Sequence, residues 1–522
     1  MALAPAILTE ETPRALSTRL EGTTSEASRS SLSQTGILFS FLATFVLCAV
    51  PLVVAIRPIA APVCDPDLWW HLRVGEWVVQ HGSVPETDPF SAYGQGKKWV
   101  AYSWLYEVLL YELNAVFGLA GIIIYRAALS LAIGVAVQRL IMRNRPTTPG
   151  TACLAAVSLL ALAMLFSERP WLFTILFGTL TLHAVLDMRE GRFTLLAWLL
   201  PVIFIVWANV HIQFVYGLAL LLLGCIAPLI DRVLMRGDQR TPATVGRPGW
   251  RLYLVTVLCF LATLVNPYRA ELYRVVIEYA TQPGPFQFVN ELKAPDFREV
   301  TDWAMIGLLG GAAFALGRRR RLSSFDVLLL IGGAYLSLRS RRDLWVGVLA
   351  AASILSSSGF LSDPTTIPPR WQLRYRVAFA AMLVFLAIGL CVVRDLSANR
   401  LERTVSSVFP VAAARFVEER GYTGPLYNDF NWGGYFIRAL PELPVAIDGR
   451  TNLHGDERLL RFGATIAGAP GWSDDPDLAK AGIVIVDVRT PLASLLKGDA
   501  RFALVFEDDI ARVFIARGQA TH

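Results

Sequence analysis

Apolar runs about as long as a membrane is thick recur through most of this 522-residue chain. About 20 apolar residues are needed for a helix to cross a bilayer, and on that rule the sequence predicts about eleven spans. The composition agrees, because 54% of the residues are hydrophobic and only 17% are charged, whereas about a quarter of the residues of soluble domains are charged. We therefore expect a polytopic α-helical membrane protein with spans near residues 37–57, 119–138, 150–167, 171–187, 193–209, 213–231, 250–266, 302–316, 325–338, 344–360 and 377–394.

The basic excess of the chain does not indicate nucleic-acid binding. There are 48 Lys and Arg residues against 42 Asp and Glu, a formal charge of +6, and much of it lies in short loops where cytoplasmic anchoring explains it better. Most of the 6 cysteines lie inside apolar runs without a Cys-x-x-Cys pair, so we expect them to be packing residues. The first apolar run begins only near Ile37, which favours a retained first span over a cleaved signal peptide.

Lys and Arg residues in the short loops predict the orientation of the chain, because cytoplasmic loops carry an excess of them. With the N-terminus in the cytoplasm, the basic loops are all cytoplasmic: Arg139/Arg143/Arg145, Arg189/Arg192, Asp231–Arg251, Arg318–Arg321 and Arg370/Arg374/Arg376. An odd number of spans then places the segment after Arg394 outside the cell. The outer loops are Cys64–Lys98, Ser167–Pro170, Asn209–Gln213, Asn266–Asp302 and Arg339–Asp343.

The chain changes character after residue 397, where it becomes more charged and alternates helix-like with strand-like stretches. We expect a cytoplasmic disordered tail over residues 1–36, a transmembrane domain over residues 37–397 with a first outer loop at 58–118, and an extracytoplasmic α/β domain over residues 398–522. That domain is long enough to have its own core. Its patterns predict a helix at Val411–Arg420, strands at Val445–Asp448 and Ile483–Val488, and a hairpin of Phe502–Glu507 with Ala511–Ala516.

Charged side chains gather where the first outer loop begins. Two carboxylates, an imidazole and a guanidinium lie close together in sequence: Asp65, Asp67, His71 and Arg73. Pro66 favours a helix that begins near Asp67, so Asp67 and His71 share one face of it. This cluster suits a divalent cation or a phosphorylated ligand, although a helix cap with an aromatic membrane anchor would explain the same residues. Later in this loop, Val84–Ser91 and Trp99–Glu107 predict two short helices on the membrane surface.

Polar side chains in the other outer loops each have two explanations. Glu168 and Arg169 are either a mutually neutralised turn or a second carboxylate for the site of Asp67. His211 lies at a break between two spans, together with Asn209 and Gln213, and is either a packing residue or part of the site. Arginines run against the positive-inside trend on this side, so Arg339, Arg341 and Arg342 bind a lipid phosphate or diphosphate, or extend to the lipid headgroups.

The layout of the chain resembles that of GT-C membrane glycosyltransferases, because it combines many spans, an acidic-aromatic-His motif and an outer α/β domain. Within that superfamily it looks most like oligosaccharyltransferase catalytic subunits, in which an Asp of the first outer loop is followed by aromatics and often His-x-Arg, as in Asp67–Arg73. Those enzymes place another acidic motif where Glu168 lies here. Phe430–Tyr435 is similar in composition to their acceptor motif but lacks its Trp-Trp-Asp core, and Asp448–Arg450 is similar to a segment of uncharacterised bacterial membrane proteins.

The resemblance implies a glycosyltransferase that moves a sugar or glycan from a polyprenyl-phosphate or polyprenyl-diphosphate donor to an acceptor glycan, lipid or protein. Asp67 would be the general base or a metal ligand, and Asp67 and Glu168 would share Mg²⁺ or Mn²⁺. The further catalytic residues would be Asp65, His71 and Glu168. The phosphate of the donor would be bound by Arg73, Arg169, Arg339, Arg341, Arg342 and His211. The acceptor would be bound by Asn209, Glu291, Asn431, Trp432, Tyr435, Asp448 and Arg450. The other partners would be membrane lipids, and nucleic acid would not be a partner. The protein would lie in a bacterial inner membrane.

Other functions fit the same layout. A transporter or flippase for lipid-linked glycans would have charged or Gly/Pro-broken segments at the midplane and symmetry between halves. A polymerase or ligase of surface polysaccharide would use Arg and His rather than a carboxylate base, and a scaffold would use its outer domain to bind a partner. The polar groups lie mainly at one predicted interface, which favours an enzyme.

Overall fold

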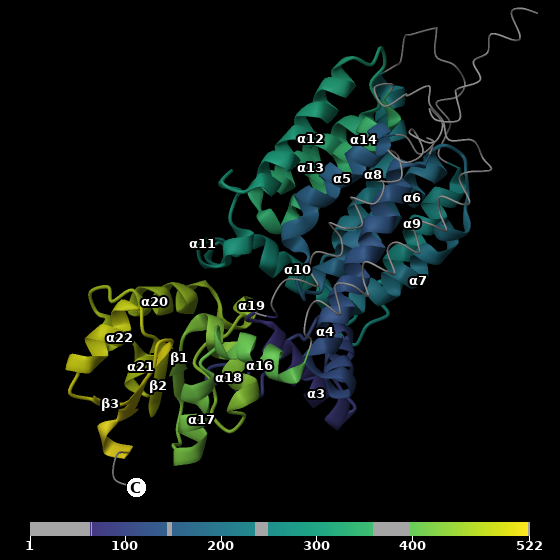
Figure 1. The fold of residues 1–522 in the computed structure, drawn as a ribbon. Helices are drawn as coiled ribbons and strands as arrows, with labels where there is room; N and C mark the ends of the chain where they lie inside the picture. Colours follow the sequence, from purple (N-terminus) through teal and green to yellow (C-terminus); the bar gives the residue numbers. More distant parts are fainter. Residues whose placement is uncertain (1–62, 64, 144–148, 235–248, 359–396, 520–522) are drawn as a thin grey trace, which may run out of the picture.

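The computed structural model describes residues 63, 65–143, 149–234, 249–358 and 397–519. Within that part, apolar helices lie side by side in one bundle, and the chain from α16 (Ala398–Ser406) onward lies at one end of the bundle (Figure 1). The predicted tail at residues 1–36 and the predicted spans at 37–57 and 377–394 lie outside the described residues.

Four helices of the bundle are long and apolar enough to cross a bilayer: α4 (Trp104–Ile141), α6 (Trp171–Arg189), α8 (Phe214–Leu234) and α12 (Val300–Gly317). Shorter apolar helices complete the described bundle: α5 (Pro149–Leu162), α7 (Leu195–Val210), α9 (Trp250–Ala262), α13 (Ser324–Arg339) and α14 (Leu344–Ser357). Each of these helices overlaps one predicted span, but the predicted total of eleven is not confirmed. The chain is a mostly helical, multi-pass membrane protein.

The helix α4 is longer than the span predicted within it and bends at Gly118, whose φ of 60° and ψ of −158° interrupt the helical backbone. Its first turn is Trp104–Glu107, so the surface helix predicted at Trp99–Glu107 is wrong. The one predicted at Val84–Ser91 is wrong too. There Asp88 accepts hydrogen bonds from the backbone N–H groups two and three residues further on, at 3.0 and 3.1 Å, and such a turn competes with a helix.

The C-terminal residues form a four-stranded mixed sheet with the strand order β1-β2-β4-β3. β1 (Leu426–Asn428) is parallel to β2 (Ile483–Asp487), and β2 is antiparallel to β4 (Ala511–Ala516). β3 (Phe502–Glu507) forms a hairpin with β4, and α17 (Val411–Arg420) precedes the sheet. The predicted helix, buried strand and hairpin are therefore confirmed.

The strand predicted at Val445–Asp448 is wrong, because Val445 forms isolated bridges instead of a ladder. The side chain of Asn428 donates a hydrogen bond to the Ile447 carbonyl at 2.8 Å and accepts one from the Ala446 N–H at 3.0 Å. The Ala446 N–H also donates to the Leu426 carbonyl at 2.8 Å, so this segment is held by a side chain and by single backbone hydrogen bonds rather than by a regular ladder.

The helix α3 (Leu68–His81) joins the bundle to the C-terminal part, since it packs against both α4 and α18 (Gly433–Ala439). α18 comes close because a Cβ added at Gly434 would lie 2.6 Å from the Pro66 carbonyl oxygen. One apolar core runs through both parts of the described chain. The domain boundary at residue 398 stays a prediction.

Short helices fill the predicted loops and surround the sheet. The outer loop predicted at Asn266–Asp302 contains α10 (Glu271–Thr281), α11 (Gly284–Phe288) and η3 (Asn290–Leu292). The others are η2 (Ala163–Leu165), η4 (Arg341–Asp343), η6 (Phe430–Trp432), α19 (Thr451–His454), α20 (Asp456–Ile466), η7 (Trp472–Asp474), α21 (Pro476–Ala479), α22 (Pro491–Leu495), η8 (Leu496–Gly498) and η9 (Arg517–Gln519).

Candidate functional site

The loops predicted to be on the outer side meet at one end of the bundle. Arg169 lies 2.5 Å from Asp65, and Arg342 lies 3.2 Å from His211. The segment η3 likewise contacts η4. Residues from distant parts of the sequence therefore share one site. The side of the membrane that this end faces stays a prediction.

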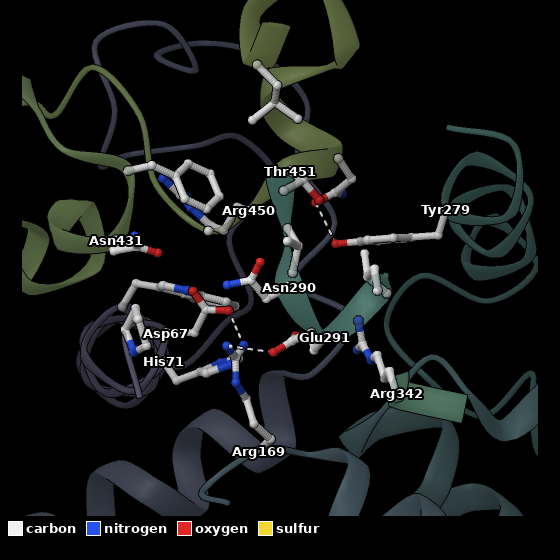
Figure 2. A pocket seen from close by; sticks show the side chains of 18 of the residues that line it. Asp67, His71, Arg169, Tyr279, Asn290, Glu291, Arg342, Asn431, Arg450 and Thr451 are labelled. Carbon is white, nitrogen blue, oxygen red and sulfur yellow. Dashed lines mark hydrogen bonds and ion pairs between the residues drawn. The ribbon is translucent and has the colours of Figure 1, made fainter. Parts of the chain in front are cut away.

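A cavity of about 520 Å³ lies where this end of the bundle meets the C-terminal residues (Figure 2). Charged side chains gather on its bundle side, whereas the C-terminal residues add mainly uncharged groups. The lining includes the side chains of Asp67, Trp70, His71, Ser103, Glu107, Arg169, Trp171, Tyr279, Asn290, Glu291, Arg342, Asn431, Arg450, Thr451 and Asn452.

Arg169 lies at the centre of the charged half (Figure 2). Its guanidinium donates to Asp65 at 2.5 Å and to Asp67, and Glu291 lies 3.7 Å away. Burial raises the pKa of Asp65 to about 7, although Arg169 acts to lower it. Burial acts to lower the pKa of Arg169, but the three carboxylates hold it well above its usual value. Arg169 therefore stays charged and is compensated, so it orients Asp67 more readily than it binds a further anion.

His71 and Glu107 form a buried pair in the cavity wall, with Nδ1 of the histidine 3.1 Å from Oε1 of the glutamate. Burial lowers the pKa of His71 well below its usual value, so the ring is neutral. Oε2 of Glu107, Oγ of Ser103 and Nε1 of Trp70 are buried without a hydrogen-bond partner in the described structure. Because buried polar groups are nearly always hydrogen-bonded, this wall suits a polar molecule in the cavity.

Arg342 differs from Arg169, because its guanidinium contacts a histidine and a tryptophan ring. Its Nη2 lies 3.2 Å from Nε2 of His211, and its guanidinium lies over the ring of Trp171, 5.3 Å from the ring centre. Within the described ranges it forms no ion pair with a carboxylate, and its Nε has no hydrogen-bond partner. Arg342 is therefore the lining cation best able to bind an anion.

Arg450 lines the cavity but its donors are already used. It donates to Asp448 from Nε at 2.8 Å and from Nη2 at 2.7 Å, and to Asp88 from Nη1 at 2.5 Å. All three side chains are almost fully buried. Arg450 therefore holds the first outer loop to the C-terminal part, and the predicted acceptor residue Asp448 lies behind it, outside the lining.

Gly449 is needed because it lies against Asp67: a Cβ added there would be 1.9 Å from Oδ1 of that carboxylate. We expect Gly449→Ala to destabilise the protein by about 1–3 kcal/mol through overpacking, measured by thermal unfolding in detergent. Gly498→Ala is the matched control, because an added Cβ there meets nothing within 4 Å. Equal unfolding temperatures for the two variants would contradict this close approach.

The structure brings into the cavity lining fewer than half of the residues predicted for the site: Asp67, His71, Arg169, Glu291, Arg342, Asn431 and Arg450. Asp65 lies just behind the lining, bound to Arg169. Glu168 does not face the cavity, because its carboxylate accepts a hydrogen bond from Arg126 at 2.6 Å and is buried. The predicted phosphate ligand Arg73 is also elsewhere and pairs with Glu76 at 2.8 Å.

The remaining predicted residues outside the lining each have another contact. Arg341 pairs with Asp302 at 3.0 Å, and Arg339 is exposed and lies over the ring of Phe286. His211 is buried behind Arg342. The predicted acceptor residues are packed in: Asn209 accepts a hydrogen bond from Trp104, Tyr435 stacks on Phe409, and Trp432 is buried against Phe436.

Several lining or supporting residues were not predicted for the site. The sequence could have identified Arg126, because a charged residue within a predicted span is costly and needs a partner. In the structure that partner is Glu168. Tyr279 donates a hydrogen bond to Asn452 at 3.1 Å. Such pairs join elements far apart in the sequence, so no local pattern could have identified them.

The residues present do not fit the divalent ion predicted for Asp67 and Glu168. Asp67 lines the cavity, whereas Glu168 is bound to Arg126 and lies outside the lining, so the two carboxylates do not face one space. In the part of the chain that the structure describes, no group of three or more His, Cys, Asp or Glu side chains is placed to hold a metal ion. The ion stays a prediction.

Comparison with known proteins adds a likeness in overall fold. No protein-family model matches the chain, and no curated protein matches its sequence. Among solved structures, it is similar at 16% identity to ArnT from Cupriavidus metallidurans bound to undecaprenyl phosphate, with a TM-score of 0.46 over 92% of this chain and 98% of that one. The apo state of ArnT gives 16% identity and a TM-score of 0.47, over 90% and 97% of the two chains. The arabinofuranosyltransferase AftD from Mycobacteria gives 16% identity and a TM-score of 0.49, over 93% of this chain and 42% of that one.

Proposed function

We propose that this protein is a membrane glycosyltransferase that moves a sugar or glycan from a polyprenyl-phosphate donor to an acceptor on the extracytoplasmic side. The observation that carries the proposal is that Asp67 and Arg342 line the same cavity at the end of an apolar helix bundle. A carboxylate that can take a proton then lies in one space with a cation that can bind a phosphate.

The charges of the cavity favour a donor with a single phosphate. Arg169 and Arg450 are both compensated by carboxylates, so Arg342 is the available cation in the described lining. A sugar phosphodiester carries one negative charge, which matches one guanidinium, whereas a diphosphate carries two. The lipid tail would lie along the apolar bundle, since polyprenyl chains are insoluble in water.

Asp67 is the proposed general base. The acceptor hydroxyl gives its proton to the Asp67 carboxylate, the acceptor oxygen forms a bond to the anomeric carbon, and the bond from that carbon to the phosphate oxygen breaks. The electron pair stays on the leaving polyprenyl phosphate, whose charge Arg342 stabilises. Arg169 fixes the direction of the carboxylate.

The other half of the cavity suits an uncharged acceptor with hydroxyl groups. Asn431, Thr451 and Asn452 line it from the C-terminal part, and Asn290 lines it from η3. Amide and hydroxyl side chains both donate and accept hydrogen bonds, as recognition of a sugar requires. A polysaccharide ligase would fit the same lining, whereas a flippase would move the donor without breaking its sugar–phosphate bond.

Replacing Arg342 tests donor binding directly. We expect Arg342→Gln to raise the KM for a polyprenyl-phosphate sugar about tenfold or more, because a charge-assisted hydrogen bond to the phosphate is lost. The assay is transfer of radiolabelled sugar in proteoliposomes. Arg339→Gln is the matched control, since this exposed arginine lies outside the lining, and its KM should change less than about twofold. Equal KM values for the two variants would contradict the assignment of Arg342.

Chelation tests the predicted metal ion. We expect transfer to continue in EDTA, because Asp67 lines the cavity but Glu168, bound to Arg126, does not face it. The measurement is the initial rate with EDTA, then with added Mg²⁺ or Mn²⁺. Loss of the rate in EDTA and its recovery with either ion would show that the ion predicted from the sequence takes part.

A further inference from the structure

A second hollow lies beside α3 and α16, and we call it the α16 groove. Its volume is about 820 Å³. Two neighbouring tryptophans of α3 point to different spaces, because Trp70 lines the cavity and Trp69 lines the groove. The groove is therefore separate from the proposed active site, but both lie at the same end of the bundle.

The groove contains positive charge that the described protein does not neutralise. Arg403, Arg415 and Arg438 line it, and within the described ranges none of them forms an ion pair with a carboxylate. The carboxylates in the lining are Glu402 and Asp508, and Asp508 already accepts hydrogen bonds from two backbone N–H groups at 2.8 and 2.7 Å. Burial lowers the pKa of Arg438, although Glu76 acts to raise it.

Trp69 provides a hydrogen-bond donor in the same groove. Its side chain is 7% exposed, and its ring makes edge contacts with Phe409 at 5.4 Å and Tyr435 at 5.5 Å. Its Nε1 is buried without a hydrogen-bond partner in the described structure. Because buried donors are nearly always paired, this one fits a ligand with acceptor oxygens.

An apolar surface continues from the groove along α4. Leu119 lines the groove beside the bend at Gly118, and the two residues before the bend, Val116 and Phe117, are 67% and 61% exposed. Exposed apolar side chains beside arginines and a tryptophan are typical of the membrane interface, where headgroups meet acyl chains.

We propose that the α16 groove binds the phosphate of an anionic phospholipid headgroup, with an acyl chain along the exposed face of α4. Guanidinium groups match phosphate oxygens in geometry and charge, and the single phosphate of such a lipid balances the one positive charge by which the arginines exceed the carboxylates. The proposal does not depend on the chemistry at Asp67, since it uses other residues.

The test is photolabelling of the full chain in phosphatidylcholine nanodiscs that contain a trace of photoreactive phosphatidylglycerol. We expect Arg415→Gln/Arg438→Gln to lower labelling about tenfold, and Trp69→Phe, which keeps the ring packing, to lower it about threefold. The matched control is Arg489→Gln/Arg501→Gln, because these arginines are already paired with Asp487 and Asp499.

Labelling that is the same in all variants would overturn the proposal. Labelling of the unmodified protein that millimolar inorganic phosphate abolishes would overturn it as well, because the groove would then bind free anions rather than lipid. If the double variant fails to fold, the result with Trp69→Phe alone decides, as this variant removes one N–H and keeps an aromatic side chain.

Discussion

Replacing Asp67 by asparagine should lower sugar transfer by about 10²–10⁴-fold, since this is the usual contribution of a positioned general base. Asparagine has the same shape but cannot accept the proton of the acceptor hydroxyl. The KM for the donor should change little, because Arg342 is untouched. The measurement is single-turnover transfer in proteoliposomes.

Asp296→Asn is the matched control for this variant. Asp296 pairs with Arg341, is 51% exposed and lies outside the cavity lining, so its loss should leave the rate within about twofold. A rate for Asp67→Asn that equals that of the control would remove the proposed base, whereas the assignment of Arg342 would still stand on its own variant.

Replacing Arg450 by methionine should destabilise the protein by about 3–5 kcal/mol, because it leaves buried carboxylates without their cation. Both Asp88 and Asp448 are fully buried and bind this one guanidinium. Arg450 holds the pKa of Asp448 well below its usual range, against burial, which acts to raise it. In the variant, Asp448 loses its arginine partner, so the free energy of unfolding at neutral pH should fall.

The measurement is the shift in thermal unfolding of the purified protein. Arg489→Met is the matched control: Arg489 also pairs with an aspartate, Asp487, but it is 84% exposed, so its loss should cost less than about 1 kcal/mol. Similar shifts for Arg450→Met and Arg489→Met would mean that Arg450 does not hold the two parts of the molecule together.

Local patterns could predict the elements whose side chains depend on near neighbours. The hairpin of β3 and β4 follows from alternating apolar residues around a turn, and the bundle helices follow from continuous apolar runs. Val445–Asp448 has the composition of a strand but is not one, since isolated bridges and the side chain of Asn428, a residue from another segment, hold it. The residues of this segment alone do not predict that it lacks a strand.

The candidate site was predictable as a location but not as a set of contacts. Charged residues at the ends of apolar runs indicated which loops would meet. Glu168 and Arg169 are neighbours in sequence, yet one is bound by Arg126 and the other binds Asp67. Which of two adjacent side chains enters a cavity depends on the rotation of the chain around its helices. Glu168 therefore lies outside the cavity lining, and its functional role stays a prediction.

Donor binding in the cavity is tested most directly by the labelling site of a photoreactive polyprenyl phosphate in proteoliposomes. If the cavity binds the donor phosphate, label should attach near Arg342 and Trp171, and it should decrease about tenfold in Arg342→Gln and persist in Asp67→Asn. Label at the opposite end of the bundle, near Arg189 and Arg319, with none in the cavity lining, would show that the donor phosphate does not bind in this cavity.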